Sequence, residues 1–202
     1  MSTASITLKQ PRVLADVLPK SLTTDIALVV GAAALVGLLA QVSIPLGFTP
    51  VPLTGQTLGV LLAGSVLGWR RATVSMSLYL FAGLAGVPWY AEHSHGVPAS
   101  GSLGYIVGFI FAGALLGALA SKGDSKDVVR TIGSMILAEV VIYAFGVIWL
   151  ANVWHWSAAE AIKLGLAPFI IGDIIKAGIA GLVIPATWRL VDKADKSKSE
   201  KP

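Results

Sequence analysis

Three ionisable side chains lie inside long apolar stretches of this 202-residue chain. Glu139 interrupts one stretch. Asp173 and Lys176 interrupt another, in the run Pro-Phe-Ile-Ile-Gly-Asp-Ile-Ile-Lys that starts at Pro168. A charged group at the centre of a membrane span costs about 2.5–3.5 kcal/mol on insertion scales, so such groups are usually paired, buried in protein and functional. These three residues are therefore the first candidates for binding or chemistry.

The spacing of Asp173 and Lys176 places both on one face of a helix, because they are three residues apart. That face continues through small residues that permit close helix packing, namely Ala177, Ala180 and Gly181. A helix starting near Pro168 would hold Asp173 about 8 Å and Lys176 about 12 Å below its first turn. The pair could form the floor of an outward-opening pocket and offer one acceptor and three donors to a polar ligand. Alternatively, the two charges only neutralise each other and fix helix packing, without a role in ligand binding.

Glu139 and the aromatic loop near residue 90 leave several interpretations open. Glu139 could face the same pocket, pair with the lysine, or lie near the inner membrane surface. Trp89 and Tyr90 suit either ligand stacking or anchoring at a membrane interface. His93 and His95 lack a supporting carboxylate cluster, so we expect no metal site.

Other kinds of chemistry have no motif in this chain. The sequence has no G-x-x-x-x-G-K-[ST] phosphate cradle, and it has neither an H-E-x-x-H nor a G-x-S-x-G signature for hydrolysis. It also has no cysteine, which excludes disulfides and thiolate metal ligands. We therefore expect a protein that is not an enzyme and carries no cofactor.

Composition indicates which elements must position these residues. Only 13% of residues are charged and the mean hydropathy is +0.78, whereas soluble domains carry about 25% charged residues. Apolar runs near the length of a membrane span occur at 26–44, 55–69, 71–88, 101–121, 128–150 and 168–190. The run at 55–69 is short, so it is either tilted or ends inside the protein. The sequence predicts an all-α membrane protein, a bundle of six transmembrane helices.

The basic residues predict the orientation of that bundle. All but two of the 15 lysines and arginines lie in the N-terminal segment, the loops after the second and fourth spans, or the C-terminal end. Positive residues gather on the cytoplasmic side, so both termini should be cytoplasmic. This alternation also argues against a basic patch for nucleic acid. We expect a cytoplasmic tail at 1–24, a membrane-embedded domain at 25–190 and a basic cytoplasmic tail at 191–202.

The loop between the first two spans looks unlike a solvated turn. Residues 41–54 carry no charge and include three prolines, Pro45, Pro50 and Pro52. Proline fixes φ and restricts the residue before it, so this loop should be stiff as well as apolar. It could plug or roof a cavity on the outer face, or it could be a rigid connector in the lipid interface.

Several stretches together resemble the BioY family, the biotin-specific substrate-binding (S) components of energy-coupling-factor (ECF) transporters. They are Gln-Val-Ser-Ile-Pro at 41–45, Pro-Val-Pro-Leu-Thr-Gly-Gln-Thr-Leu-Gly-Val-Leu-Leu-Ala-Gly at 50–64, Gly-Leu-Ala-Gly-Val-Pro at 83–88, Gly-Tyr-Ile-Val-Gly-Phe at 104–109, Ile-Tyr at 142–143 and the run 168–176. The likeness covers about residues 25–190. The strings at 50–57 and 172–176 look specific to this family.

The resemblance implies a biotin pocket near the outer surface, contacted by Asp173 and Lys176. The family follows its Gly-x-Pro turn with small residues, whereas this chain has Glu-His-Ser-His at 92–95, which makes Glu92 a candidate polar contact. The implied partners are an ECF transmembrane coupling protein and ABC-type ATPases in the cell membrane. The implied coupling contact uses small residues of the first helix, either Ala27 with Gly31 or Ala33 with Gly37. The main rival function is a self-sufficient proton-coupled small-molecule carrier; the others are an intramembrane enzyme that uses the Asp/Lys pair and a scaffold without a ligand.

The predicted orientation can be tested by chemical labelling from each side of the membrane. Single cysteines placed at Lys122 and in the C-terminal tail should react with an impermeant reagent only from the cytoplasmic side, and one near His95 should react from outside. The native chain has no cysteine, which gives a clean background. A C-terminus that is labelled in intact cells would overturn the topology.

Overall fold

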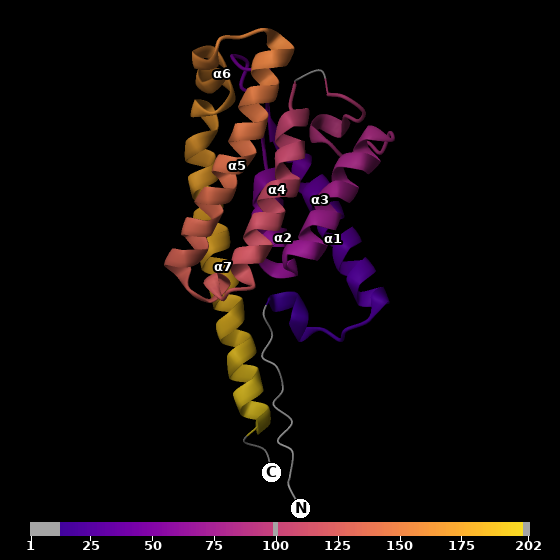
Figure 1. Ribbon diagram of the computed structural model, residues 1–202, viewed down its shortest axis with the longest axis vertical. Coiled ribbons are helices and arrows are strands. Elements are labelled where there is room, and N and C mark those ends of the chain that lie inside the picture. Colours follow the sequence, from indigo (N-terminus) through magenta and orange to yellow (C-terminus); the bar gives the residue numbers. More distant parts are fainter. Residues whose placement is uncertain (1–12, 99–100, 200–202) are drawn as a thin grey trace, which may run out of the picture.

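The computed structural model describes residues 13–98 and 101–199 as a bundle of helices that run between two ends (Figure 1). The helices are α1 (Leu22–Ala40), α2 (Gln56–Leu67), α3 (Trp69–Leu84), α4 (Leu103–Ala120), α5 (Val128–Trp154), α6 (Ala158–Gly165) and α7 (Ile170–Ser199). Short 3-10 turns are η1 (Leu14–Val17), η2 (Ala91–His93), η3 (Asp124–Lys126) and η4 (Ala167–Phe169). Strands β1 (Ser43–Ile44) and β2 (Leu53–Thr54) form an antiparallel pair.

The predicted six-helix bundle is confirmed, because α1 to α5 and α7 correspond in order to the six apolar runs. Among the described residues, four helical stretches are long and apolar enough to cross a membrane, namely Leu22–Ala40, Leu103–Ala120, Val128–Trp154 and Ala158–Ser197. The run at 55–69 forms only the 12-residue α2, and α3 has 16 residues. The short helix α6 was not predicted.

The outer surface of the bundle is apolar. On α7, for example, large hydrophobic side chains are exposed at Ile171, Ile174, Ile175 and Leu182, while Asp173 and Ala177 are buried. A soluble monomer rarely exposes apolar surface so continuously, but lipid tails solvate it well. Asp173 therefore lies inside while most isoleucines of α7 face outward, the reverse of a soluble helix.

One end of the bundle, here called the basic end, holds η1, the α2–α3 turn, η3 and the C-terminal part of α7 (Figure 1). Residues 1–12 and 200–202 of the expected tails lie outside the described residues. The rest of the N-terminal segment packs on the bundle, since Val13 and Ala15 are buried, and α1 already begins at Leu22. At the other terminus α7 continues without a break past residue 190 to Ser199.

Close helix packing around α4 depends on glycines. Eleven of the 18 residues of α4 are buried, against four of 19 in α1, and α4 packs against α2, α3 and α5. A Cβ on Gly64 of α2 would lie 2.7 Å from the Leu116 Cβ of α4, and a Cβ on Gly117 would strike the backbone at Trp69. The α2–α3 turn itself needs a glycine at Gly68, whose φ is 79°. Small residues thus set the distance between α2, α3 and α4.

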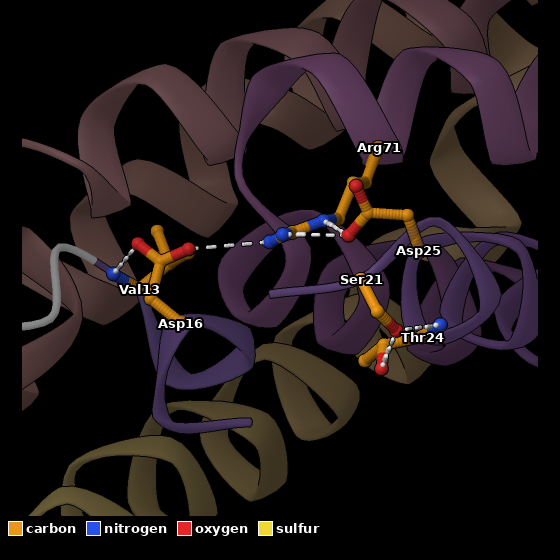
Figure 2. A network of polar contacts seen from close by, with 6 residues as sticks. All are labelled: Val13, Asp16, Ser21, Thr24, Asp25 and Arg71. Carbon is orange, nitrogen blue, oxygen red and sulfur yellow. Dashed lines mark hydrogen bonds and ion pairs between the residues drawn. The ribbon is translucent and has the colours of Figure 1, made fainter. Parts of the chain in front are cut away.

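A polar clamp joins three elements at the basic end (Figure 2). Arg71 at the start of α3 donates from Nε to Asp25 of α1 at 2.8 Å and from Nη1 to Asp16 of η1 at 3.2 Å. Ser21 begins α1 by accepting a hydrogen bond from the Thr24 amide at 3.0 Å. The clamp fixes η1 and the first turn of α1 to α3.

Removing the clamp should destabilise the protein. We expect Arg71→Ala to lower the free energy of unfolding by about 1–3 kcal/mol, because two carboxylates lose a charge-assisted donor. The loss should lie near the lower figure, since the Asp25 side chain is 46% exposed and solvent screens that pair. Thermal unfolding in detergent measures the effect. The control is Arg70→Ala, which removes an exposed guanidinium lying 5.3 Å over the Trp69 ring. Equal stability of the two variants would contradict a structural role for the clamp.

Candidate functional site

A cavity that opens to solvent lies among the segment after β1, α2, α4, α5 and the start of α7. Most of its wall is apolar or aromatic, with a few polar groups. The lining residues are Val51, Pro52, Leu53, Thr54, Gln56, Thr57, Ala91, Ser102, Tyr105, Ile106, Phe109, Ile142, Tyr143, Phe169, Asp173 and Lys176. A mostly apolar lining with a few placed polar groups is typical of small-molecule sites. The proline-containing loop supplies part of the wall, which favours the cavity-covering interpretation over a connector in the lipid interface.

Three polar groups of the cavity wall converge on the carboxylate of Asp173. Its Oδ1 accepts hydrogen bonds from Lys176 Nζ at 2.7 Å and from Thr57 Oγ1 at 3.0 Å. Lys176 Nζ also donates to Thr57 Oγ1 at 2.8 Å. The Tyr143 hydroxyl donates to the other carboxylate oxygen, Oδ2. Three helices, α2, α5 and α7, thus meet at one carboxylate.

Burial makes this cluster costly to break. The Asp173 side chain is 7% exposed and that of Lys176 is 15% exposed. The attraction between two opposite charges taken out of water offsets their desolvation penalty only if their geometry is good and their remaining donors and acceptors are satisfied. Removal of either partner would leave an unpaired buried charge. The pair predicted from spacing is therefore present and buried, and it faces the cavity.

The packing of α7 explains why the pair points inward. Asp173, Ala177, Ala180 and Gly181 are all buried, as the small-residue stripe predicted. A Cβ on Gly181 would run into the Ile132 side chain of α5, so α5 and α7 lie in close contact there. Since α7 can approach α5 this closely, Tyr143 on α5 reaches Asp173.

Trp89 and Tyr90 belong to a separate network beside the cavity and are not among its lining residues. Trp89 donates from Nε1 to the Tyr79 carbonyl at 2.9 Å, and Tyr90 donates to the Leu80 carbonyl at 2.5 Å. Burial raises the pKa of Tyr90 to about 12, so it stays a neutral donor. Gln41 binds the carbonyls of both aromatic residues, at 3.3 and 3.1 Å. Their ligand role stays a prediction, and the observed contacts hold the loop.

Glu92 is exposed and lies outside the main cavity. It lines a second hollow together with Pro45, Thr49, Pro50, Pro52, Ala91, Ser94 and Pro98. Pro52 and Ala91 line both spaces, so the second hollow adjoins the first. Glu92 is therefore placed beside the cavity and away from the polar cluster. Within residues 13–98 and 101–199 no three metal-ligating side chains gather.

The two small-residue pairs of α1 have different environments. Ala33 and Gly37 are buried, and a Cβ on Gly37 would lie 3.1 Å from Trp89 Cβ. Ala27 and Gly31 are exposed, and nothing lies within 4 Å of a Cβ built on Gly31. Only the pair Ala27 and Gly31 is open to another helix.

Two polar residues of the cluster were not selected from the sequence. Thr57 and Tyr143 are uncharged, so neither carries the insertion cost that singles out a charge in a span. Both lie within the strings that carry the family resemblance, at 50–57 and 142–143. Their position within these family-specific strings was the sequence signal that could have identified them as site residues.

Comparison with known proteins agrees with this architecture. A family model described as the BioY family matches residues 8–193. The "Biotin transporter BioY" of Rhizobium etli is 38% identical over 173 residues, covering 80% of this chain and 91% of the relative. The "Biotin transporter BioY" of Thermotoga maritima is 36% identical over 152 residues, covering 74% of this chain and 87% of the relative.

A solved structure shares the fold. It is titled as the S-component for biotin from an ECF-type ABC transporter and has a TM-score of 0.75 with 23% identity. The match covers 85% of this chain and 95% of that one. Together with the long apolar helices, these relatives make the chain a multi-pass membrane protein. The chain belongs to the BioY family of transporters.

Proposed function

We propose that this protein binds biotin in the cavity above Asp173 and Lys176 and mediates biotin uptake across the cell membrane as the substrate-specific component of an ECF transporter. The observation that carries the proposal is the buried cluster of Asp173, Lys176, Thr57 and Tyr143 at the wall of an otherwise apolar cavity. The names of the relatives identify the ligand class.

The chemistry of biotin suits this wall. The ureido ring presents two N–H donors and a carbonyl acceptor, and the thiophane ring and valeryl chain are apolar. An ionised carboxylate has about four lone-pair positions. Asp173 uses three of them, for Lys176, Thr57 and Tyr143. It therefore has room for a ureido N–H, while Lys176 can donate to a ligand oxygen. Tyr105, Phe109 and Phe169 supply apolar surface for the rings.

Uptake against a gradient needs an energy source, because tight binding alone shifts no equilibrium between the two sides. This chain has no P-loop motif for ATP. We infer that an ECF transmembrane coupling protein and ABC-type ATPases supply the energy, with Ala27 and Gly31 of α1 as the helix-packing contact. The comparisons favour this assignment over a self-sufficient proton-coupled carrier, since the structural relative is a component of an ATP-driven transporter.

The binding assignment predicts that Asp173→Asn and Lys176→Ala weaken biotin binding about tenfold or more. Losing one partner of a buried charged hydrogen bond costs about 1–3 kcal/mol or more, and 1.4 kcal/mol is tenfold in affinity. Isothermal titration of the purified protein with biotin measures the change.

Lys163→Ala is the matched control, because Lys163 is an exposed lysine on α6. It should bind biotin as the wild type does. Thermal unfolding of each variant checks that the bundle is intact. Wild-type affinity in both cavity variants would show that the ion pair is structural only.

The coupling assignment predicts that Gly31→Leu reduces ATP-dependent biotin uptake severalfold while the isolated subunit binds biotin normally. Nothing lies within 4 Å of a Cβ built on Gly31, so we expect the added side chain to act on a partner helix. Gly37→Leu is unsuitable because it would clash with Trp89.

Uptake and affinity should be measured in the same variants. Gly133→Leu is the control, since Gly133 is also exposed with nothing within 4 Å of its Cβ position, but lies on α5. Uptake that persists without any coupling ATPase and stops with a proton uncoupler would favour the carrier instead.

A further inference from the structure

The second hollow adjoins the proposed biotin cavity, and the binding proposal leaves it without an occupant. Its lining residues all come from the loop between α1 and α2 and the loop between α3 and α4, and two of them, Pro52 and Ala91, also line the cavity. The polar cluster around Asp173 does not reach it. With the ureido ring held at that cluster, the valeryl chain points away from it and can leave the cavity past Pro52 and Ala91 into the second hollow.

The side chains of the second hollow offer hydrogen-bond acceptors. Four of its eight lining residues are prolines, which have no N–H. The Thr49 hydroxyl donates to the Leu164 carbonyl at 2.8 Å, and the Ser94 hydroxyl donates to the Ala91 carbonyl at 2.7 Å. Both hydroxyl protons are thus used, while the hydroxyl oxygens keep lone-pair capacity and Glu92 adds a carboxylate. These side chains can accept a hydrogen bond from a ligand, but they have no proton left to donate to a ligand carboxylate.

The charge of the second hollow has the same preference. Among the described residues that line it, Glu92 is the only one with a full charge. Neither residues 41–54 nor residues 86–102 contain a lysine or arginine. In the adjoining cavity the lining cation is Lys176, which is bound at the polar cluster, and the buried Glu139 lines neither space. A carboxylate at the end of the valeryl chain would therefore meet a like charge without a compensating cation.

The backbone fixes Glu92 beside the hollow although its side chain is exposed. Its φ is 58°, in the left-handed region that residues other than glycine rarely adopt. The Tyr90 amide donates to the Ser94 carbonyl at 3.1 Å, which closes the turn around Glu92. The amide of the next residue, His93, donates to Gln41 Oε1 at 3.1 Å. Strained conformations of this kind persist only where the surroundings determine them, and they cluster at ligand contacts.

Resting on the proposed function, we propose that the second hollow is a subsite for the tail of the ligand, and that Glu92 selects biotin derivatives whose carboxyl group is joined to an amine as an amide. An amide removes the negative charge of the free acid and brings an N–H donor to a wall of acceptors. A tail that ends in an ammonium adds a cation opposite Glu92. Free biotin still binds, because the contacts of its ureido ring are the same.

Three ligands test the proposal on the full chain: biotin, its primary amide, and the cationic amide that biotin forms with ethylenediamine. Competition against radiolabelled biotin measures all three affinities. We expect the cationic amide to bind tightest and free biotin weakest, with about three- to tenfold between them, since an exposed charge pair contributes modestly. The difference should shrink at high salt, which screens exposed charges.

Variants at Glu92 should change the order of the three ligands. Glu92→Gln keeps the shape of the side chain without its charge, so the cationic amide and free biotin should differ by about twofold or less. Glu92→Lys should make free biotin the tighter ligand, and it provides a second route if the glutamine variant is unstable. The control is Glu160→Gln, at an exposed acid of α6 that lines neither space, and it should keep the wild-type order.

Two outcomes would overturn the proposal: wild-type protein that binds free biotin as tightly as the cationic amide, or a preference for the amide that Glu92→Gln leaves unchanged. Both would leave the proposed function standing, because biotin would still bind. If the wild type bound none of the three ligands, the proposed function itself would be wrong.

Discussion

The cost of holding two opposite charges away from water shapes this bundle. Asp173 and Lys176 are acceptable inside an apolar helix only because each finds its partner and further polar groups within hydrogen-bond distance. Thr57 and Tyr143 come from α2 and α5, so the three helices must meet at that height. The same cluster that satisfies the charges also leaves a lone pair facing an apolar cavity. Stability and recognition therefore draw on the same atoms.

Meeting that requirement depends on how closely the helices approach. In a membrane the hydrophobic effect does not drive helices together, and small residues instead allow close van der Waals packing between them. Gly64 and Gly117 bring α2 and the α2–α3 turn against α4, and Gly181 brings α7 against α5. These contacts lie nearer the basic end than the cavity does. Equally close contacts lie beside the cavity, where a Cβ on Gly146 would lie 2.2 Å from the ring of Tyr105, so close packing runs along the whole bundle.

Much of this could be predicted from the sequence, for identifiable reasons. Apolar runs and basic loops gave the six helices, and the i, i+3 spacing with its small-residue stripe placed Asp173 on an inner face. Helix α6 was not predicted, because eight amphipathic residues resemble a loop. Thr57 was not predicted as a site residue, because a hydroxyl in a membrane span has a low free energy of insertion compared with a charge. The choice between Gly31 and Gly37 needed the position of Trp89, a residue distant in sequence that covers one of them.

Helix α1 has few buried residues, yet it is held at both ends. The Arg71 clamp fixes its first turn (Figure 2), and Gln41, which follows its last residue, binds the backbone at Trp89, Tyr90 and His93. Between these ends the inner side of α1 packs on the bundle, since Ala33 and Val36 are fully buried and the Ser75 hydroxyl donates to the Val29 carbonyl at 2.9 Å. In mechanical terms α1 is a strut braced along one side. Its outer end is bound to the loop that carries Ala91, a wall residue of the cavity, so a displacement of α1 along its axis would reach the cavity wall.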